Sequence, residues 1–355
     1  MVNIDNLSEM QKLDKSNVLG SVDALSQQCL HAWEEVSKIN IPANYKEVNK
    51  VLVCGMGGSA LGAHVIQALF SDSKIMIDIK RSYDLPGWVD DQTLIILSSY
   101  SGSTEETISC AKQALAKKLK CLIIATGGQL GEIAEKENIP WYKINPTYNP
   151  SNQPRMAVGY SIFGQIALLA QTGLIDIQKD EVKDVINFLE NREKGFKPTV
   201  ESSVNFAKST AQKILGKIPV LVAADFLEGS VHVFNNQLNE NAKNFSNFAY
   251  IPELNHHLME GLKFPESNPK NLVFIFFKSS LYSEIIQKRF ALTKDVVEKN
   301  NLSTVEVRLT GQSRLEQVFE VIQFGAFTAF YLSMLNNLDP APIPWVDYFK
   351  EQLKK

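Results

Sequence analysis

Short apolar runs that alternate with helix-like stretches dominate the first half of this sequence. The runs are rich in Ile, Val and Leu and cover residues 50–55, 74–79, 93–99 and 120–126. Helix-like stretches follow three of them, at 59–70, 105–118 and 129–137. Strands that are apolar along their whole length and alternate with helices are typical of a parallel sheet covered on both faces. The first half of the chain therefore predicts an α/β fold.

A second alternating series begins near residue 217. Its apolar runs cover 217–224, 271–277 and 304–310, and its helix-like stretches cover 228–243, 283–300 and 313–336. A loop at 145–154 and helical patterns at 158–172 and 180–194 separate the two series. A helical segment at 18–38 precedes them and a short helix at 345–354 ends the chain. We expect two similar α/β domains, at 1–195 and 196–355, which fits a length of 355 residues.

Composition and charge exclude several classes of protein. The chain is 45% apolar and 21% charged, with a net charge of −3 and no dense Lys/Arg tract, so nucleic acid is not an expected partner. The cysteines, at 29, 54, 110 and 121, form no CxxC pair and no zinc-type cluster, so we expect no metal site and a reducing compartment. The polar N-terminus is unlike a signal peptide, and no long uncharged apolar run suits a membrane. We expect a soluble cytoplasmic protein.

The sequence "GMGGSA" at 55–60 lies between a predicted strand and a predicted helix. Its glycines, Gly55, Gly57 and Gly58, let backbone N–H groups approach a ligand, and a helix N-terminus favours an anion. Two other interpretations exist. One is a tight turn without a ligand; the other is the dinucleotide fingerprint G-x-G-x-x-G/A, with Asp78 as its acidic residue.

A second loop, "SSYSGSTEET" at 98–107, helps to decide between these interpretations. It contains six Ser and Thr residues and also lies between a strand and a helix. A capping box of Ser103 and Glu106 would account for only one or two of the hydroxyls. Hydroxyls and backbone amides from two neighbouring loops can surround one terminal phosphate, whereas a dinucleotide needs no second loop of this kind. The pair of loops favours a phosphate pocket.

The two loops together resemble those of the sugar isomerase (SIS) domain, a flavodoxin-like unit that binds phosphosugars. Four further motifs resemble the bifunctional phosphoglucose/phosphomannose isomerase family: "QPRMAVGY" (153–160), "NQLNENAKNF" (236–245), "PELNHHLMEG" (252–261) and "DYFKEQL" (347–353). The resemblance covers the chain from about residue 18 to its end. It implies two tandem SIS domains in a homodimer. It also implies interconversion of glucose, fructose and mannose 6-phosphates through a cis-enediol, with no metal or cofactor.

The resemblance also implies roles for particular residues. Glu240 would be the base that moves a proton between C1 and C2, and Arg155 would stabilise the enediolate. His256, reaching the active site of a neighbouring subunit, and Lys350 would open the sugar ring. The 6-phosphate would be held by Gly57, Gly58, Ser59, Ser99, Ser101 and Thr104.

Several residues can also be judged without the resemblance. Glu240 lies between two asparagines in a predicted helix, a poor helix-forming site, and partial burial would raise its pKa toward the operating pH. His256 and His257 are adjacent and so would not share a helix face to hold a metal. The chain departs from the usual family pattern at His257 and Leu258, and at Ala341 in "DPAP". The last departure bears on the mannose branch of the activity.

Three alternatives remain for comparison. A non-catalytic phosphosugar sensor usually carries a helix-turn-helix, and the segment before the first strand is too short and weakly basic for one. An aminosugar synthase would need an N-terminal glutaminase domain with a nucleophilic cysteine. An NAD(P)-dependent oxidoreductase leaves the hydroxyl loop unexplained, and Asp78 is expected inside its strand rather than at the end. The isomerase is the leading hypothesis, with the sensor as its alternative.

Overall fold

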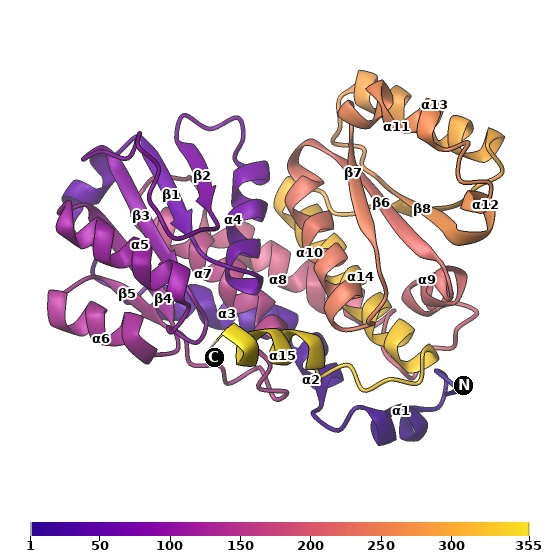
Figure 1. Ribbon diagram of the computed structural model, residues 1–355, viewed down its shortest axis with the longest axis horizontal. Coiled ribbons are helices and arrows are strands. Elements are labelled where there is room, and N and C mark those ends of the chain that lie inside the picture. The colour runs from indigo at the N-terminus through magenta and orange to yellow at the C-terminus, as the bar shows by residue number, and fades with distance from the viewer. Residues whose placement is uncertain (1, 354) are drawn as a thin grey trace.

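The computed structural model describes residues 2–353 and 355 and contains two parallel sheets. The first has the order β2-β1-β3-β4-β5 and the second the order β7-β6-β8-β9, with every pair of neighbours parallel. Figure 1 shows the sheets in separate halves of the molecule, with helices α4, α10 and α14 between them. The strands are β1 (Lys50–Cys54), β2 (Met76–Lys80), β3 (Thr93–Ser98), β4 (Lys120–Ala125), β5 (Trp141–Lys143), β6 (Ile218–Ala224), β7 (Asn247–Ile251), β8 (Leu272–Lys278) and β9 (Ser303–Arg308). The expected pair of α/β units is confirmed.

The helices of the first half cover the first sheet and precede it. They are α1 (Leu7–Leu13), α2 (Val18–Asp23), α3 (Leu25–Val36), η1 (Ala43–Glu47), α4 (Gly58–Leu69), α5 (Glu105–Ala116), α6 (Gly128–Glu137), η2 (Pro154–Met156), α7 (Val158–Gln171) and α8 (Lys179–Glu193). Those of the second half are α9 (Phe206–Ile214), η3 (Asp225–Leu227), α10 (Glu228–Glu240), η4 (Glu253–His256), α11 (Leu258–Gly261), α12 (Asn268–Asn271), α13 (Glu284–Lys299), α14 (Arg314–Leu335) and α15 (Pro344–Leu353).

The connections that follow β1 and β3 leave the first sheet on opposite faces. Successive side chains of β1 point to opposite faces. Val51 and Val53 join the core that contains α4, whereas Leu52 and Cys54 join the core that contains α5. The chain therefore leaves β1 toward one face and leaves β3 toward the other. In open parallel sheets, ligands bind at the carboxyl ends of the strands where the connections diverge in this way.

The two domains share one hydrophobic core. Helix α14 is long and apolar enough to cross a membrane, with a mean hydropathy of 1.5, yet all of that segment is buried inside the protein. Helices α4 and α10 pack across the domain boundary, where the rings of His64 and His232 lie 4.3 Å apart between centroids. A Cβ at Gly229 would lie 2.3 Å from the carbonyl oxygen of His64, so this approach requires glycine. The core fixes the domains against each other.

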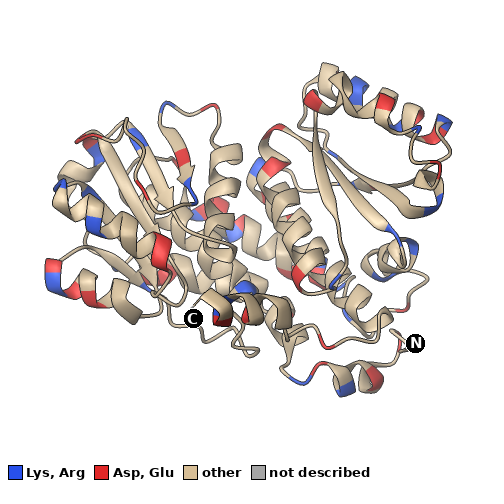
Figure 2. Cartoon of the chain, in the orientation of Figure 1, with Lys and Arg blue, Asp and Glu red and all other residues tan. Residues whose placement is uncertain are grey.

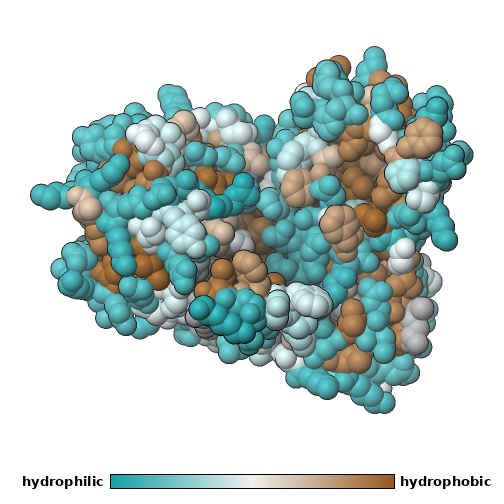
Figure 3. All heavy atoms as spheres, viewed as in Figure 1, coloured by the Kyte–Doolittle hydropathy of each residue, from teal (hydrophilic) through white to brown (hydrophobic). Residues whose placement is uncertain are grey.

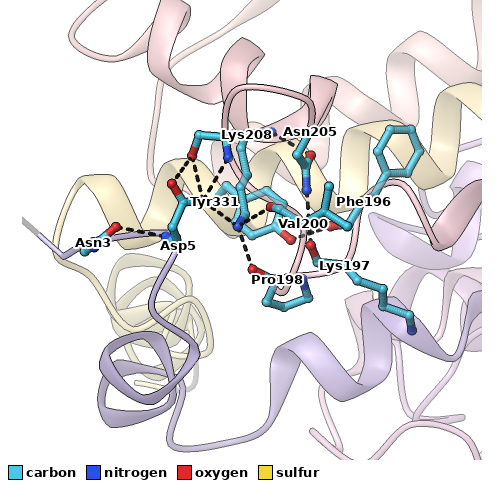
Figure 4. Close-up of polar contacts among 10 residues, drawn as sticks. Asn3, Asp5, Phe196, Lys197, Pro198, Val200, Asn205, Lys208 and Tyr331 are labelled. Atoms are coloured by element: carbon cyan, nitrogen blue, oxygen red, sulfur yellow. Dashed lines mark hydrogen bonds and ion pairs between the residues drawn. The ribbon is translucent and has the colours of Figure 1, made fainter.

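A buried lysine joins the N-terminal arm to the second domain. Lys208 is fully buried, and its Nζ donates to Asp5 Oδ1 at 2.9 Å and to the carbonyls of Pro198 and Val200 at 2.7 and 2.8 Å. Ser202 Oγ also donates to the Asp5 carboxylate. Figure 4 shows this network between the arm, the connection after α8 and helices α9 and α14. No pattern in the sequence had indicated that the N-terminus would contact the second domain.

The surface carries both signs of charge. Figure 2 shows Lys and Arg interspersed with Asp and Glu over both domains. In the space-filling view of Figure 3, the surface is hollowed where the two domains meet.

Candidate active site

The first predicted loop connects the end of β1 to the start of α4, at the carboxyl edge of the first sheet. Gly57 has φ 49° and ψ −127°, a conformation that glycine adopts without strain, and no atom lies within 4 Å of a Cβ built there. A Cβ at Gly58 would lie 3.7 Å from the Cα of Arg155. The loop thus presents open backbone at the N-terminus of α4, beside Arg155. Such a helix start favours an anion.

The second loop carries the hydroxyls. Ser99 is buried and its Oγ lies 2.7 Å from Thr104 Oγ1, while Ser101 is exposed. Thr104 is the N-cap of α5 and makes no side-chain capping hydrogen bond. The capping box of Ser103 and Glu106 is therefore not how α5 begins, and capping does not account for these hydroxyls.

Hydrogen bonds join the two loops directly. The backbone N–H of Tyr100 donates to Ser59 Oγ at 3.0 Å, and Ser98 Oγ donates to the Ser59 carbonyl at 3.0 Å. Gln165 of α7 donates to the same carbonyl at 3.2 Å. The structure thus brings the two loops side by side, as a shared phosphate pocket requires.

Arg155 links the first domain to two segments of the second. Its Nε donates to Asn241 Oδ1 at 2.9 Å, and its Nη1 donates to Gln153 Oε1 at 3.1 Å. Its Nη2 donates to the carbonyls of Pro340 and Ala341 at 3.0 and 2.5 Å. Among the described residues these bonds engage four of the five guanidinium N–H groups. The fifth, on Nη1, has no hydrogen-bond partner among the described residues.

A buried glutamine of the N-terminal helices holds the Arg155 segment. Gln28 of α3 donates from Nε2 to the carbonyls of Met156 and Tyr148 at 3.0 and 2.9 Å. Its Oε1 accepts from the N–H of Gly159 at 3.1 Å. The helical segment before the first sheet therefore supports the site, a role that we did not predict.

Glu240 is the last residue of α10 and is half-buried. Burial raises the pKa of its carboxyl group, against the opposing charges of Arg155, Lys243 and Lys350. Burial also lowers the pKa of Arg155, and Glu240 is the first of three carboxylates that oppose this. Three of the predicted residues are therefore close enough to interact electrostatically: Arg155, Glu240 and Lys350. A carboxylate with a raised pKa in such a place can accept and return a proton.

Lys350 is carried by a helix with no buried residue. Helix α15 follows the loop that Arg155 binds, and Lys350 itself is exposed. Ala341, where the chain departs from the family pattern, is buried and contacts Arg155 through its backbone carbonyl. The contact uses only the backbone carbonyl, so it does not depend on the side chain at position 341.

The structure does not bring His256 to the other site residues of the same chain. His256 ends η4 and is exposed, as is His257. This segment runs into α11, which Figure 1 shows at the far end of the second domain from α15. Within one chain, His256 is therefore not part of the group formed by Arg155, Glu240 and Lys350.

Asp78 does not suit a dinucleotide. It lies within β2, paired with Leu52 of β1, and its Oδ1 accepts from the N–H of Ile79 at 2.8 Å. The acidic residue of a dinucleotide site must reach a ribose beyond the end of its strand. Among residues 2–353 and 355, no group of three or more His, Cys, Asp and Glu side chains could hold a metal ion.

Sequence reasoning missed Gln153, Asn241 and Lys243, which surround Arg155. All three lie within the quoted motifs "QPRMAVGY" and "NQLNENAKNF". Lys243 Nζ donates to the Pro340 carbonyl at 2.7 Å, and burial lowers the pKa of this lysine to about 8. The only feature of the sequence that could have indicated these three residues is that they are polar and lie close to Arg155 or Glu240 in the chain.

The chain is similar to known proteins in both sequence and fold. Residues 203–353 match the family model described as the bacterial phospho-glucose isomerase C-terminal SIS domain. The chain is 33% identical over 343 residues to a bifunctional phosphoglucose/phosphomannose isomerase of Caldicellulosiruptor bescii, covering 94% of this chain and 98% of that protein. It is 31% identical over 230 residues to a D-glucosamine-6-phosphate 4-epimerase of Sulfolobus acidocaldarius, covering 64% and 68% of the two chains. A hypothetical protein from Thermus thermophilus has the same fold, with a TM-score of 0.74, 16% identity and coverage of 95% and 89%.

Proposed function

The chain belongs to the bifunctional phosphoglucose/phosphomannose isomerase family, and from this we propose that it interconverts glucose 6-phosphate and fructose 6-phosphate, and also mannose 6-phosphate. One observation carries the proposal. Arg155 lies beside the backbone of the first loop and binds Asn241, the residue next to Glu240. These contacts support a proposed site in which the first loop anchors the phosphate beside a fixed cation and a carboxylate with a raised pKa.

In the proposed mechanism the two loops hold the phosphate and the sugar carbons face Glu240. The Glu240 carboxylate takes the proton from C2 of the aldose. That C–H electron pair forms the C1–C2 double bond of a cis-enediolate, and the C1 carbonyl pair moves onto O1. The same carboxyl group returns the proton to C1 while the proton of O2 passes to O1, which gives the ketose. The charge of Arg155 and its remaining N–H group stabilise the oxygen that becomes negative. Transfer on one face of the enediol gives one C2 epimer of the aldose, and the other epimer forms when the enediol presents its opposite face at C2 to the same carboxyl group.

Ring opening requires groups near the ring oxygen. We assign this step to Lys350 and to His256 of a second subunit, so that the working form is a homodimer. The support is the position of His256, exposed on a segment that Figure 1 shows far from α15. A cytoplasmic location completes the proposal.

The substrate range distinguishes the proposed isomerase from an epimerase like the Sulfolobus relative. We expect fructose 6-phosphate to give glucose 6-phosphate and mannose 6-phosphate in coupled assays. We expect glucosamine 6-phosphate to be returned without inversion at C4. Inversion at C4 together with no aldose–ketose exchange would replace the isomerase with an epimerase like the Sulfolobus relative.

The loop hydroxyls should contribute mainly to binding. Replacing Ser101 with Ala and Thr104 with Val removes two donors to the phosphate. Because each hydrogen bond to a charged group contributes about 1.5–3 kcal/mol, affinity for fructose 6-phosphate should fall by about 100-fold or more. Isothermal titration measures this loss. The matched control is Ser280→Ala, an exposed serine in the corresponding loop after β8. Equal affinities in the two variants would rule out the phosphate assignment.

Acid should inactivate the enzyme at a higher pH than an ordinary glutamate would allow. A protonated carboxyl group cannot accept a proton, and burial raises the pKa of Glu240. As pH falls, kcat/KM should therefore decline above the usual glutamate range, which lies near about 4.3. Profiles from about pH 4 to about pH 8 measure the decline. Because histidine titrates in the same range, the decline must keep its position in His256→Gln. A shift in that variant would assign it to His256.

A further inference from the structure

The carbonyl of Pro340 accepts hydrogen bonds from two cations. Lys243 Nζ donates to it at 2.7 Å, and Arg155 Nη2 donates at 3.0 Å. Arg155 Nη2 also donates to the next carbonyl, that of Ala341. Two positive groups from different domains therefore hold one short loop.

This loop is the attachment point of α15. The helix begins at Pro344, shortly after Ala341, and none of its residues is buried. Its large apolar side chains are all exposed: Trp345, Val346, Tyr348, Phe349 and Leu353. Within the described chain, no side chain of 344–353 forms a hydrogen bond or ion pair with the body of the protein. The position of α15, and of Lys350 on it, thus depends on how the loop is held.

The backbone conformation of Lys243 also supports a role for its side chain. Lys243 has φ 52°, the left-handed region in which helices commonly end at glycine or asparagine. A lysine is less stable than a glycine in this backbone conformation. The side chain that occupies this costly position is the one that reaches Pro340.

We propose that Lys243 is a positioning residue, which together with Arg155 clasps the Pro340 carbonyl and so sets where α15 holds Lys350 relative to Glu240. The structural part of this inference concerns α15 alone. Its effect on turnover rests on the proposed isomerase function.

Hydrogen exchange tests the structural part without any substrate. In Lys243→Met, the amides of α15 should exchange about 10-fold faster, because one hydrogen bond to a charged group is lost. The amides of β1 and β6 should keep their wild-type rates, which excludes general unfolding. The matched control is Lys217→Met, a lysine whose Nζ donates to Ser303 Oγ at 3.0 Å away from this loop. Unchanged exchange in α15 of Lys243→Met would overturn the proposal.

A double-mutant cycle tests the effect on turnover. Lys243→Met should lower kcat by about 10-fold with little change in affinity for fructose 6-phosphate, and Lys243→Arg should restore most of the loss. If Lys243 acts through Lys350, then Lys243→Met combined with Lys350→Met should be no slower than Lys350→Met alone. Independent, multiplying losses would mean that Lys243 acts on the substrate or through the charge it presents to Glu240, and would overturn the positioning role. If the wild-type protein shows no turnover, the proposed isomerase function is wrong. The exchange result still shows whether Lys243 holds the Pro340 loop and α15 in place.

Discussion

Glu240→Gln should lose about 10³-fold to 10⁴-fold in kcat, because a positioned acid–base group contributes up to that much and an amide cannot accept the proton. The glutamine has the same size and can still accept a hydrogen bond. Neither phosphate loop contains Glu240, so affinity for fructose 6-phosphate should stay close to wild type. Steady-state rates and isothermal titration on the same preparation separate the two effects.

The matched control lies at the other end of the same helix. Glu228 begins α10 and is also half-buried, and burial together with Asp225 raises its pKa to about 7. Glu228→Gln therefore removes a similar carboxyl group away from Arg155 and should keep the wild-type rate. Turnover retained in Glu240→Gln, or lost equally in Glu228→Gln, would place the base elsewhere.

Gly102→Ala should have the largest effect on the phosphate pocket. Gly102 has φ 70°, and an added Cβ would lie 1.8 Å from the carbonyl oxygen of Gly127. That oxygen belongs to the backbone of the neighbouring loop, and the Gly102 carbonyl in turn accepts from the N–H of Leu130 at 2.9 Å. The hydroxyl loop would have to move. We expect the free energy of unfolding to fall by about 3–5 kcal/mol, and phosphosugar affinity to fall by about 100-fold or more, the size expected for losing two charged hydrogen bonds.

Gly173→Ala is the control that separates the cost of a left-handed backbone from the cost of a steric clash. Gly173 has φ 74°, but no atom lies within 4 Å of a Cβ built there. Its replacement should cost only the left-handed conformation, about 1–2 kcal/mol, and should leave binding unchanged. Chemical denaturation and titration of both variants give the comparison. Equal losses of stability would show that the contact with Gly127 does not constrain the loop.

The two domains use similar loops for different purposes. Asp225, after β6, has φ 48°, close to the φ of 49° at Gly57 after β1. The loop in the second domain, however, carries the carboxylates of Asp225 and Glu228, and Tyr282 accepts from the N–H of Ala224 through its hydroxyl. The negative charges, and the use of the Ala224 N–H group by Tyr282, make this loop unfavourable for binding an anion. These features favour the first domain over the second for the proposed phosphate site.

The apolar runs in the sequence predict β1, β2, β3, β4, β6, β8 and β9, of which β2 and β9 are edge strands. Strands β1, β3, β6 and β8 are almost wholly buried and are made of long apolar runs, which are easy to recognise. Strands β5 and β7 were missed, because the first has three residues and the second is a half-buried edge strand that begins with asparagine. Short helices α1 and α9 were missed as well. Their few apolar residues give too weak a periodic pattern.

The candidate site divides in a similar way. Local motifs indicated the two loops, Arg155 and Glu240, and the structure brings these together. The bond from Lys243 to Pro340 joins residues 97 positions apart, and that from Gln28 to Met156 joins residues 128 apart. Contacts of this kind depend on how the domains pack, which one sequence does not reveal. The capping box of Ser103 and Glu106 had the right spacing, but the loop turns so that Thr104 begins the helix.

The central claim is that this chain moves a proton between C1 and C2 of a sugar phosphate. The most direct measurement adds fructose 6-phosphate to the purified protein in D₂O, with EDTA present, and follows the sugars by NMR. The account predicts glucose 6-phosphate and mannose 6-phosphate, with deuterium at C2 in those molecules for which the Glu240 carboxyl proton exchanges with solvent before it is delivered. Saturable shifts of the protein signals with no new sugar would contradict it and would leave a phosphosugar-binding protein in place of an isomerase.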